Sequence, residues 1–161
     1  MARTVGIGIQ SFDKLITEQC FYVDKTNFIK EWWENKDDVT LITRPRRFGK
    51  TLNMNMLERF FSIEYARQGK IFEGLSIWKE EKYRELQGTY PVIFLSFADI
   101  KANTFALAKE KICMLIKEIY NKHMYLQKEG FLNENEVEVI RKVFTDMTDS
   151  IAAYSLKNLS G

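Results

Sequence analysis

Hydrophobic residues follow two different patterns along this chain. Residues 39–43 and 90–97 form continuous apolar runs rich in β-branched and aromatic residues, which is typical of strands buried on both faces of a sheet. Elsewhere the apolar positions recur every three or four residues, as on the buried face of an amphipathic helix. This second pattern predicts helices over residues 12–17, 25–33, 52–61, 103–129, 133–147 and 149–159. The charged residues 79–86 predict a short surface helix.

Strands and helices in alternation, with helices in excess, predict an α/β domain. We expect three layers with a mostly parallel sheet and a helix-rich C-terminal half. Only two strong strands are visible, whereas a parallel sheet ordinarily contains more. This shortage suggests that the chain is the N-terminal part of a longer domain.

Two helix starts carry capping signals. Asp24 is expected to cap the helix over residues 25–33, where Phe28 and Trp32 would share the buried face. Asn133, followed three residues later by Glu136, predicts a capping box.

In the long helix the predicted buried stripe consists of Phe105, Ala108, Ile112, Leu115, Ile116, Ile119, His123 and Leu126.

A tight basic loop, residues 44–51 (Arg-Pro-Arg-Arg-Phe-Gly-Lys-Thr), lies between the first predicted strand and the next helix. Strand, loop and helix in this order are the context of a phosphate-binding loop. The backbone N–H groups at the helix start have no intrahelical partner, so they would point at a bound anion. Lys50 would reach the β- and γ-phosphates of a nucleotide, and the Thr51 hydroxyl would coordinate Mg²⁺.

The loop departs from the pattern G-x-x-x-x-G-K-[ST] at its first position, where Arg44 replaces the glycine. Pro45 fixes its own φ and favours an extended conformation for Arg44. The donors that would face a phosphate belong mainly to the later loop residues, so we expect a different entry to the loop and a retained anion nest. On the motif alone, a basic surface turn that binds no ligand is the alternative.

The overall composition is that of an ordinary globular domain. The 161 residues are 45% hydrophobic, 29% charged and 14% aromatic, with phenylalanine dominant, which predicts an aromatic-rich core. The net charge of +2 is too small to indicate nucleic acid or a membrane surface by itself. The sequence shows no membrane-spanning segment and no signal peptide, so the chain is expected to be cytoplasmic. Cys20 and Cys113 belong to no motif and are expected to be free thiols.

Several stretches, taken in order, resemble the bacterial and archaeal AAA-ATPase-like family. The loop over residues 44–51 is the most specific of them, and the others are residues 8–12, 22–26, 71–77 and 91–97. The resemblance covers essentially the whole chain. In this family an arginine at the first loop position is the rule, so Arg44 is a family trait.

The resemblance implies a P-loop NTPase-type fold and membership of an AAA-like ATPase. It also implies that the Walker B strand, a hydrophobic run followed by D-E-Y-D, lies beyond residue 161. Residues 1–161 would then be the N-terminal part of the ATPase domain, inactive or very slow by themselves. Many members of the family also carry a C-terminal nuclease-like domain of the PD-(D/E)XK type.

The expected nucleotide site occupies the loop and the start of the following helix. Lys50 is the expected catalytic residue, stabilising charge in phosphoryl transfer, and Thr51 is the expected metal ligand. For Arg46 and Arg47 the sequence leaves open phosphate contacts, arginine fingers across an interface, nucleic-acid backbone contacts and a solvated pair. The full set expected to bind the nucleotide is Arg46, Arg47, Phe48, Gly49, Lys50, Thr51 and Leu52.

Other chemically capable residues are expected to be structural. Helix capping is the preferred role for Asp24. Phe12 and Tyr22 are candidates for stacking on adenine, although such aromatic residues more often lie in a core. The residues before Asp99 do not fit the pattern of a Walker B acid. His123 is the single histidine in the sequence, so a metal site built from several histidines and a His-based catalytic triad are excluded.

The sequence therefore predicts ATP binding, with Mg²⁺ as cofactor, through a variant Walker A loop. Two alternatives come from other classes of protein. One is a module whose basic loop, Arg44 to Lys50, binds the phosphate backbone of nucleic acid, and the other is an interaction scaffold with a vestigial loop. The expected partner is nucleotide, and nucleic acid is a possible partner of the full-length protein. No membrane partner is expected, and a homo-oligomer is compatible with the sequence.

Overall fold

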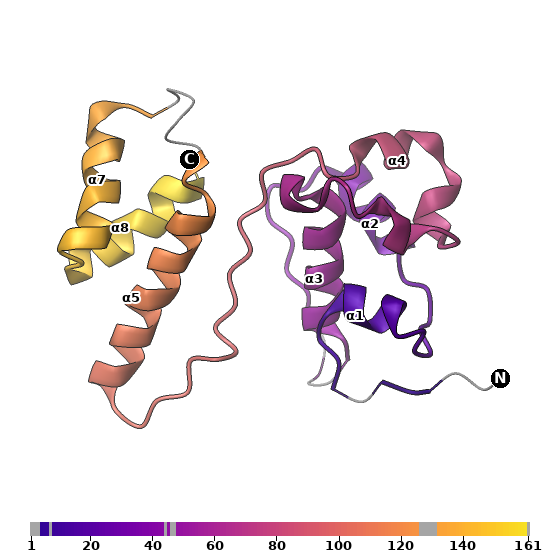
Figure 1. Cartoon of the computed structure of the whole chain (residues 1–161), viewed down its shortest axis with the longest axis horizontal. Helices are drawn as coiled ribbons and strands as arrows, with labels where there is room; N and C mark the ends of the chain where they lie inside the picture. Colours follow the sequence, from indigo (N-terminus) through magenta and orange to yellow (C-terminus); the bar gives the residue numbers. More distant parts are fainter. Residues whose placement is uncertain (1–3, 7, 44, 46–47, 126–131, 161) are drawn as a thin grey trace. The chain divides into compact units, whose positions relative to one another are not determined.

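The computed structural model describes residues 4–6, 8–43, 45, 48–125 and 132–160 of the chain. The chain divides into two compact units, Met1–Val92 and Ile93–Gly161. Helices make up the regular structure of each unit (Figure 1). Three arginines of the predicted phosphate loop, Arg44, Arg46 and Arg47, lie outside the described residues.

The first unit gathers short helical segments around one longer helix. That helix is α3 (Lys50–Phe61), and it packs against α1 (Phe12–Thr17). The remaining elements are α2 (Asn27–Asn35), the 3-10 helices η1 (Ile63–Tyr65), η2 (Gly69–Phe72) and η3 (Ser76–Lys79), and α4 (Glu81–Leu86). The predicted helices over residues 12–17 and 52–61 are confirmed.

The expected three-layer α/β domain with a mostly parallel sheet is wrong, because the described residues contain no strand. Residues 39–43 and 91–97 run as irregular chain, and the pairing found among the described residues is an isolated parallel bridge between Ser62 and Tyr90. Val39 and Leu41 are 86% and 83% exposed instead of buried. Apolar β-branched residues favour extended backbone, but a strand exists only when a neighbouring strand completes its hydrogen-bond ladder.

Aromatic rings form the core of the first unit, as the composition predicts. Phe72 lies at the centre, with its ring centroid 5.2 Å from that of Phe12 and 5.1 Å from that of Phe60. Burial on α3 is concentrated in its second half, at Met56, Glu58, Phe60 and Phe61. Each fully buried aromatic side chain contributes about 1.5–3 kcal/mol through the hydrophobic effect. The second half of α3 is thereby anchored, while its first turn lies at the surface.

The chain leaving α4 is held against the end of α3 by backbone hydrogen bonds. The Gly88 N–H donates to the Phe60 carbonyl at 2.8 Å, and the Tyr90 N–H donates to the Phe61 carbonyl at 2.9 Å. Gly88 has φ +70°, and a Cβ built on it would lie 2.2 Å from the Ala66 Cα. Position 88 therefore requires glycine both for its left-handed backbone and for this close approach.

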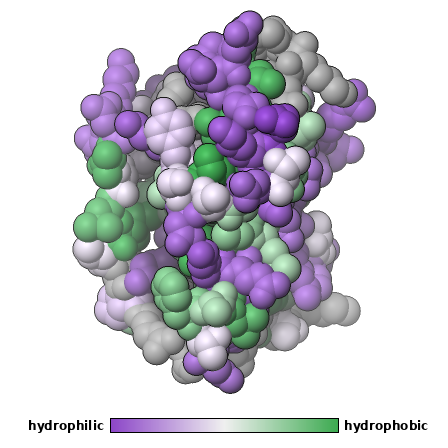
Figure 2. Space-filling model, turned by 90° about the vertical axis from the view of Figure 1, so that its left-hand side faces the viewer, coloured by the Kyte–Doolittle hydropathy of each residue, from purple (hydrophilic) through white to green (hydrophobic). Residues whose placement is uncertain are grey.

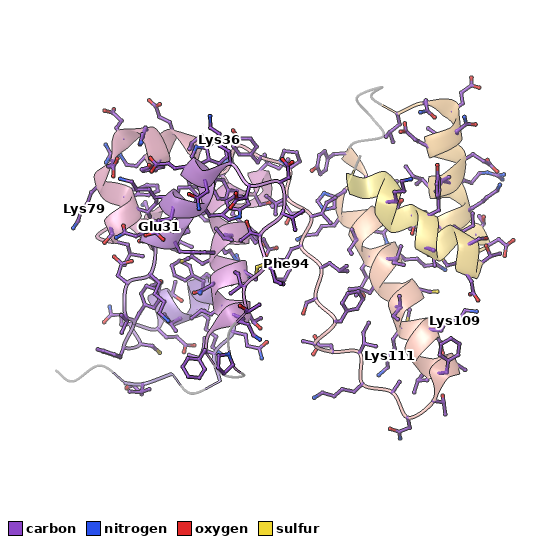
Figure 3. All side chains as sticks on the ribbon, turned by 180° about the vertical axis from the view of Figure 1, so that it is seen from behind. Glu31, Lys36, Lys79, Phe94, Lys109 and Lys111 are labelled. Atoms are coloured by element: carbon purple, nitrogen blue, oxygen red, sulfur yellow. The ribbon has the colours of Figure 1, made fainter. Side chains whose placement is uncertain are left out.

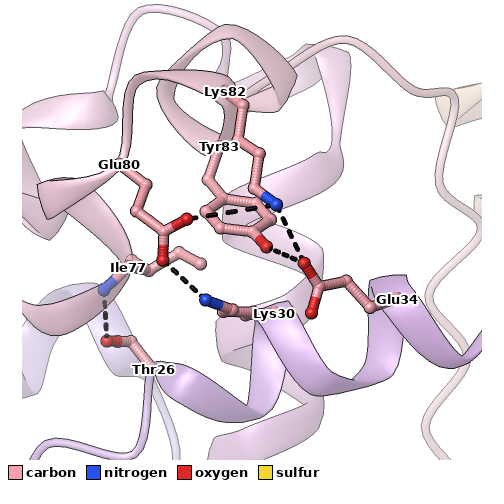
Figure 4. A network of polar contacts seen from close by, with 7 residues as sticks. All are labelled: Thr26, Lys30, Glu34, Ile77, Glu80, Lys82 and Tyr83. Atoms are coloured by element: carbon pink, nitrogen blue, oxygen red, sulfur yellow. Dashed lines mark hydrogen bonds and ion pairs between the residues drawn. The ribbon is translucent and has the colours of Figure 1, made fainter.

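The start of α2 is joined to η3 by the Asp24 and Thr26 side chains. Thr26, rather than the expected Asp24, is the N-cap residue, and its side chain does not cap the helix. The Asp24 carboxylate accepts hydrogen bonds from the Thr26 N–H at 2.9 Å, the Thr26 hydroxyl at 2.6 Å and the Ser76 N–H at 2.7 Å. The Thr26 hydroxyl in turn accepts from the Ile77 N–H at 3.1 Å (Figure 4). Asp24 therefore joins the start of α2 to η3, and we call this set of hydrogen bonds the Asp24 clamp.

Further along α2, charged side chains bind the α4 region (Figure 4). The Lys30 ammonium lies 2.7 Å from the Glu80 carboxylate. The Glu34 carboxylate accepts from the Tyr83 hydroxyl at 2.5 Å and from the Lys82 ammonium at 2.9 Å. Burial of the Tyr83 ring, and then the Glu34 carboxylate, raise the pKa of the phenol above its usual value. Tyr83 is therefore a neutral donor at physiological pH.

The second unit consists of α5 (Phe105–Lys122), α7 (Glu134–Thr145) and α8 (Asp149–Ser160). Ile116, Tyr120 and Val143 form its buried centre, and the Tyr120 hydroxyl donates to the Ser155 carbonyl at 2.9 Å. The predicted capping box of Asn133 and Glu136 is confirmed. Of the predicted α5 stripe, Ile116, Ile119 and His123 are buried, Phe105 is 83% exposed, and Leu126 lies outside the described residues.

The surface of the second unit mixes charged and hydrophobic side chains. Lys109, labelled with Lys111 in Figure 3, forms an ion pair with Asp149, and Lys111 donates to the Lys101 carbonyl at 2.6 Å. On the face drawn in Figure 2, hydrophobic residues lie in several groups separated by hydrophilic ones. Within the described part of the chain, no helix combines the length and apolarity needed to cross a membrane.

We predict that Asp24→Ala lowers the free energy of unfolding of the first unit by about 1–3 kcal/mol at pH 7, because three donors lose a charged acceptor. Unfolding in urea is followed by tryptophan fluorescence, since Trp32, Trp33 and Trp78 all belong to this unit. Asp37→Ala, which removes an exposed carboxylate, is the control and is expected to have little effect.

The effect of Asp24→Ala also depends on pH. Partial burial raises the pKa of Asp24, but the hydrogen bonds from Thr26 and Ser76 outweigh it and hold the pKa below its usual value of 3.8. A lowered carboxyl pKa stabilises the fold above the unfolded pKa, and this contribution is lost as the pH falls through the folded pKa. The difference between wild type and variant is therefore expected to shrink below pH 3.8; a constant difference would contradict the clamp.

A comparison of two glycines tests the close approach at position 88. Gly88 and Gly74 both have left-handed backbone, with φ +70° and +81°, but a Cβ at Gly74 meets no atom within 4 Å. Gly74→Ala is expected to cost about 1 kcal/mol from backbone strain alone. Gly88→Ala also displaces the Ala66 backbone, so its cost is expected to be about 3 kcal/mol or more. Equal losses in urea unfolding would contradict this packing.

Candidate functional site

Helix α3 begins at Lys50 with an open N-terminus. Gly49 precedes it in a left-handed conformation with φ 74° and ψ 20°, and no side chain caps the helix. The first helical hydrogen bond runs from the Asn53 N–H to the Gly49 carbonyl at 2.9 Å. The N–H groups of the first three helical residues, 50–52, therefore have no helical partner and are available to an anion.

A cleft of about 670 Å³ opens at this end of α3. In Figure 1 the chain that precedes α1 passes the same end of the helix. One wall is formed by Gly6, Gly8, Ile9 and Gln10, which we call the N-terminal strap, and by Leu15 of α1. The other wall is formed by Gly49, Lys50, Thr51 and Leu52. The volume lies within the range of sites for small molecules and cofactors, about 300–1,000 Å³.

Hydrogen bonds hold the chain at both ends of the strap. Before it, the Thr4 carbonyl accepts from the Phe21 N–H at 2.8 Å. After it, the Phe12 N–H donates to the Asn55 carboxamide oxygen on α3 at 2.7 Å, and the Asn55 amide donates to the buried Glu58 carboxylate at 3.0 Å. Because Asn55 lies one turn beyond Thr51, the strap is tied directly to the helix that carries the opposite wall.

Close packing also restricts the strap. A Cβ at Gly6 would lie 2.5 Å from the Ile9 Cδ1 and 3.3 Å from the Cys20 Sγ. Gly8 has φ +79°, but a Cβ there would meet no atom within 4 Å. The absence of a side chain at Gly6 therefore allows its backbone to pack against the Ile9 and Cys20 side chains. Gly8, by contrast, faces open space.

The cleft carries positive charge and apolar surface. The half-buried Lys50 ammonium forms no ion pair with another described residue. Thr51 adds an exposed hydroxyl, Gln10 an exposed amide, and Ile9, Leu15 and Leu52 add apolar groups. None of the described residues that line the cleft carries a carboxylate or an imidazole. The arrangement is suited to hold an anion joined to a less polar group.

The structure brings part of the predicted site together. Gly49, Lys50, Thr51 and Leu52 line the cleft, whereas Phe48 is 57% exposed and is not among the lining residues. Arg46 and Arg47 lie outside the described residues. Among the described residues, no group of three or more histidine, cysteine, aspartate or glutamate side chains is placed to hold a metal ion.

Of the two roles left open for Phe12 and Tyr22, packing in the core is the one that the structure shows. Phe12 is fully buried and stacks on Phe72, and Tyr22 packs edge-on against Phe12 with a centroid distance of 5.6 Å. The Tyr22 hydroxyl lies 3.5 Å from the Met56 sulfur. Neither ring lines the cleft, so both belong to the core.

The remaining candidates have structural surroundings. His123 is 4% exposed, and its Nδ1 lies 3.2 Å from the Tyr125 hydroxyl. Cys20 is a buried free thiol, and Cys113 is a partly buried one. Sequence reasoning missed the strap as a wall of the site and Asn55 as the residue that holds it. The glycines at positions 6 and 8 were the available signal, because glycine allows close approach and left-handed backbone.

Comparison with known proteins gives a relative and a family. No solved structure matches the chain. Over 96 residues the chain is 33% identical to an "Uncharacterized protein in vnfD 5'region" of Azotobacter chroococcum mcd 1. The alignment covers 59% of this chain and 17% of that protein, so the chain spans a small part of this relative. A family model described as "Predicted AAA-ATPase" matches residues 6–158, nearly the whole length, and the chain therefore belongs to the AAA-ATPase-like family.

Proposed function

We propose that the cleft between the N-terminal strap and the start of α3 binds Mg-ATP. The observation that carries this proposal is the position of the Lys50 ammonium and of three N–H groups that precede the first helical hydrogen bond, on one wall of a nucleotide-sized cleft. Membership of a predicted AAA-ATPase family supports the choice of ligand.

The phosphates are proposed to lie against Gly49, Lys50 and Thr51. The N-terminus of a helix stabilises a nearby negative charge by about 0.3–1 kcal/mol, and by up to ~2 kcal/mol where water is partly excluded. A hydrogen bond to a charged group, such as one from Lys50 to a phosphate oxygen, contributes about 1.5–3 kcal/mol. The two contributions act on the same anion, so this wall supplies the electrostatic part of the affinity.

Mg²⁺ is proposed to bind together with the phosphates. Mg²⁺ keeps several water ligands and is commonly held by one or two protein oxygens and by substrate phosphates. The exposed Thr51 hydroxyl at the cleft is the protein oxygen that fits this role. When bound, the ion would neutralise charge on the phosphates, and the Thr51 hydroxyl would be its protein ligand beside Lys50.

Hydrolysis needs more than the cleft provides. An attacking water is commonly activated by a carboxylate or an imidazole, and the described lining residues include neither of these groups. We therefore propose nucleotide binding with slow or no hydrolysis for this chain. An ATPase activity of the whole protein, with Lys50 stabilising charge in phosphoryl transfer, is part of the same proposal.

We predict that Lys50→Ala weakens Mg-ATP binding by about tenfold or more, because a charged hydrogen bond to phosphate is lost. Isothermal titration calorimetry of Mg-ATP into wild type and variant measures the change. Lys70→Ala, which removes an exposed lysine of η2 in the same unit, is the matched control and is expected to bind as wild type does.

Unchanged Mg-ATP affinity in Lys50→Ala would contradict the proposal. If wild type failed to bind Mg-ATP but bound single-stranded DNA with a strong salt dependence, the result would support the alternative of a basic loop for nucleic-acid phosphates. That alternative depends on arginines that lie outside the described residues.

A further inference from the structure

We propose that a second cavity of the first unit binds a short peptide whose two ends are free and charged. The cavity has a volume of about 540 Å³ and is lined by one face of α2 and by the irregular chain of residues 40–43. None of the described residues that line it also lines the cleft at the start of α3. The proposal therefore goes beyond the proposed function, and its test does not depend on nucleotide binding.

Two opposite charges line this cavity without pairing. Lys25 precedes α2, and Glu31, labelled in Figure 3, lies in the second turn of that helix; both side chains are exposed. Neither forms an ion pair with the other or with any other described residue. The two are six positions apart, whereas neighbours on a helix surface are three or four positions apart. Each charge is therefore available to a ligand that carries the opposite one.

The spacing of the two charges sets the length of the ligand. Hydrogen bonds from the Phe28 N–H to the Lys25 carbonyl and from the Ile29 N–H to the Thr26 carbonyl continue the helical turn back to Lys25. At a rise of about 1.5 Å per residue, Lys25 and Glu31 lie about 9 Å apart along the helix axis. Two extended residues span about 7 Å and three about 10 Å. A peptide of this length matches the spacing, whereas a single amino acid is too short.

Two carboxamides are suited to bind the peptide group between these ends. Asn27 on α2 and Asn53 on α3 line the cavity, and neither side chain forms a hydrogen bond with another described residue. A carboxamide has both donors and an acceptor, and a peptide group offers one N–H and one C=O in return. The polar lining therefore matches the middle of a short peptide as well as its ends.

Apolar side chains accompany these polar groups. Phe28, Leu41 and Ile42 line the same cavity, and Leu41 is 83% exposed. Removing such apolar surface from water is favourable, so a ligand with apolar side chains gains affinity here. We therefore expect the peptide to carry aliphatic residues, and L-leucyl-L-leucine is the probe that combines them with two charged ends.

Hydrogen bonds hold both walls of the cavity. Lys25 lies between the two residues that make the Asp24 clamp, and its N–H donates to the Tyr22 hydroxyl at 3.1 Å. The Trp32 indole N–H donates to the Thr40 hydroxyl at 3.1 Å, which ties the irregular chain to α2. Walls ordered in advance lower the entropic cost of binding. The clamp thereby fixes the backbone from which the Lys25 side chain reaches the ligand.

The test is a titration of the full chain, labelled with ¹⁵N, with L-leucyl-L-leucine, followed by the backbone amide signals in NMR spectra. Saturable shifts are expected at residues 25–31, 40–43 and 53, and added Mg-ATP is not expected to displace the peptide. Two blocked peptides are compared: N-acetyl-L-leucyl-L-leucine lacks the ammonium, and L-leucyl-L-leucine amide lacks the carboxylate. Each is expected to bind about fivefold more weakly, the upper range for a solvent-exposed charge pair.

Two variants assign the charges to their partners. In Glu31→Gln the N-acetylated peptide is expected to bind as well as the free one, because the partner of the ammonium is gone. In Lys25→Gln the same is expected of the amide. Both replaced side chains are exposed, so the fold is expected to persist. Lys79→Gln and Glu73→Gln remove exposed charges outside the cavity in the same unit, and these control variants are expected to keep the preference for the free peptide.

The inference fails if the free peptide causes no saturable shifts, or if the shifts lie outside the cavity. Equal affinities of wild type for the free and the blocked peptides would show that the charged ends are not recognised. Displacement by Mg-ATP would place the peptide in the nucleotide cleft instead. An unchanged preference for the free peptide in Glu31→Gln and Lys25→Gln would remove these two residues from the site.

Discussion

The hydrogen bond between the Phe12 N–H and the Asn55 carboxamide connects the two walls of the cleft. It joins the first residue of α1 to the second turn of α3 across 2.7 Å, and Glu58 orients the amide from the next turn. Asn55 thereby satisfies a backbone donor at the start of α1, a position where a helix has no partner of its own. The same bond sets the distance from the strap to Lys50, because Asn55 and Lys50 share one helix.

Helix α3 combines a buried end with an exposed end. Phe60 and Phe61 pack into the aromatic core, with the Phe60 ring centroid 5.1 Å from that of Phe72, and the chain beyond α4 hydrogen-bonds to the same end. In the first turn, by contrast, no side chain caps the helix among the described residues, and Lys50 is half-buried. Burial at one end holds the helix in place, so the open N-terminus at the other end is ordered without being capped.

For some polar side chains, the sequence predicts a local role whereas the structure shows a tertiary one. Asp24 has the spacing and the chemistry of an N-cap, yet its carboxylate binds the Ser76 N–H more than fifty residues away as well as Thr26. The same applies to Tyr83, which lies in a charged segment that predicts a surface helix but is 1% exposed, with its hydroxyl on Glu34. In both cases the deciding partner is distant along the chain, so spacing within the helix does not reveal it.

The amino-acid sequence by itself determined the features that depend on neighbours a few residues apart. These are the helices at 12–17 and 52–61 and the Asn133–Glu136 capping box. Helical periodicity and capping arise from contacts within one or two turns, so they can be recognised in the sequence alone.

Tertiary structure decided whether residues 39–43 and 91–97 became strands, because a strand needs a ladder partner that its own residues do not supply. Among the described residues neither run has one, and hydrophobic side chains that predict burial are exposed. The strap was decided in the same way: Gly8 and Gln10 become part of a cleft only because Asn55 brings them to Lys50. Pairing and enclosure are relations between distant segments, and no local pattern encodes which segments will meet.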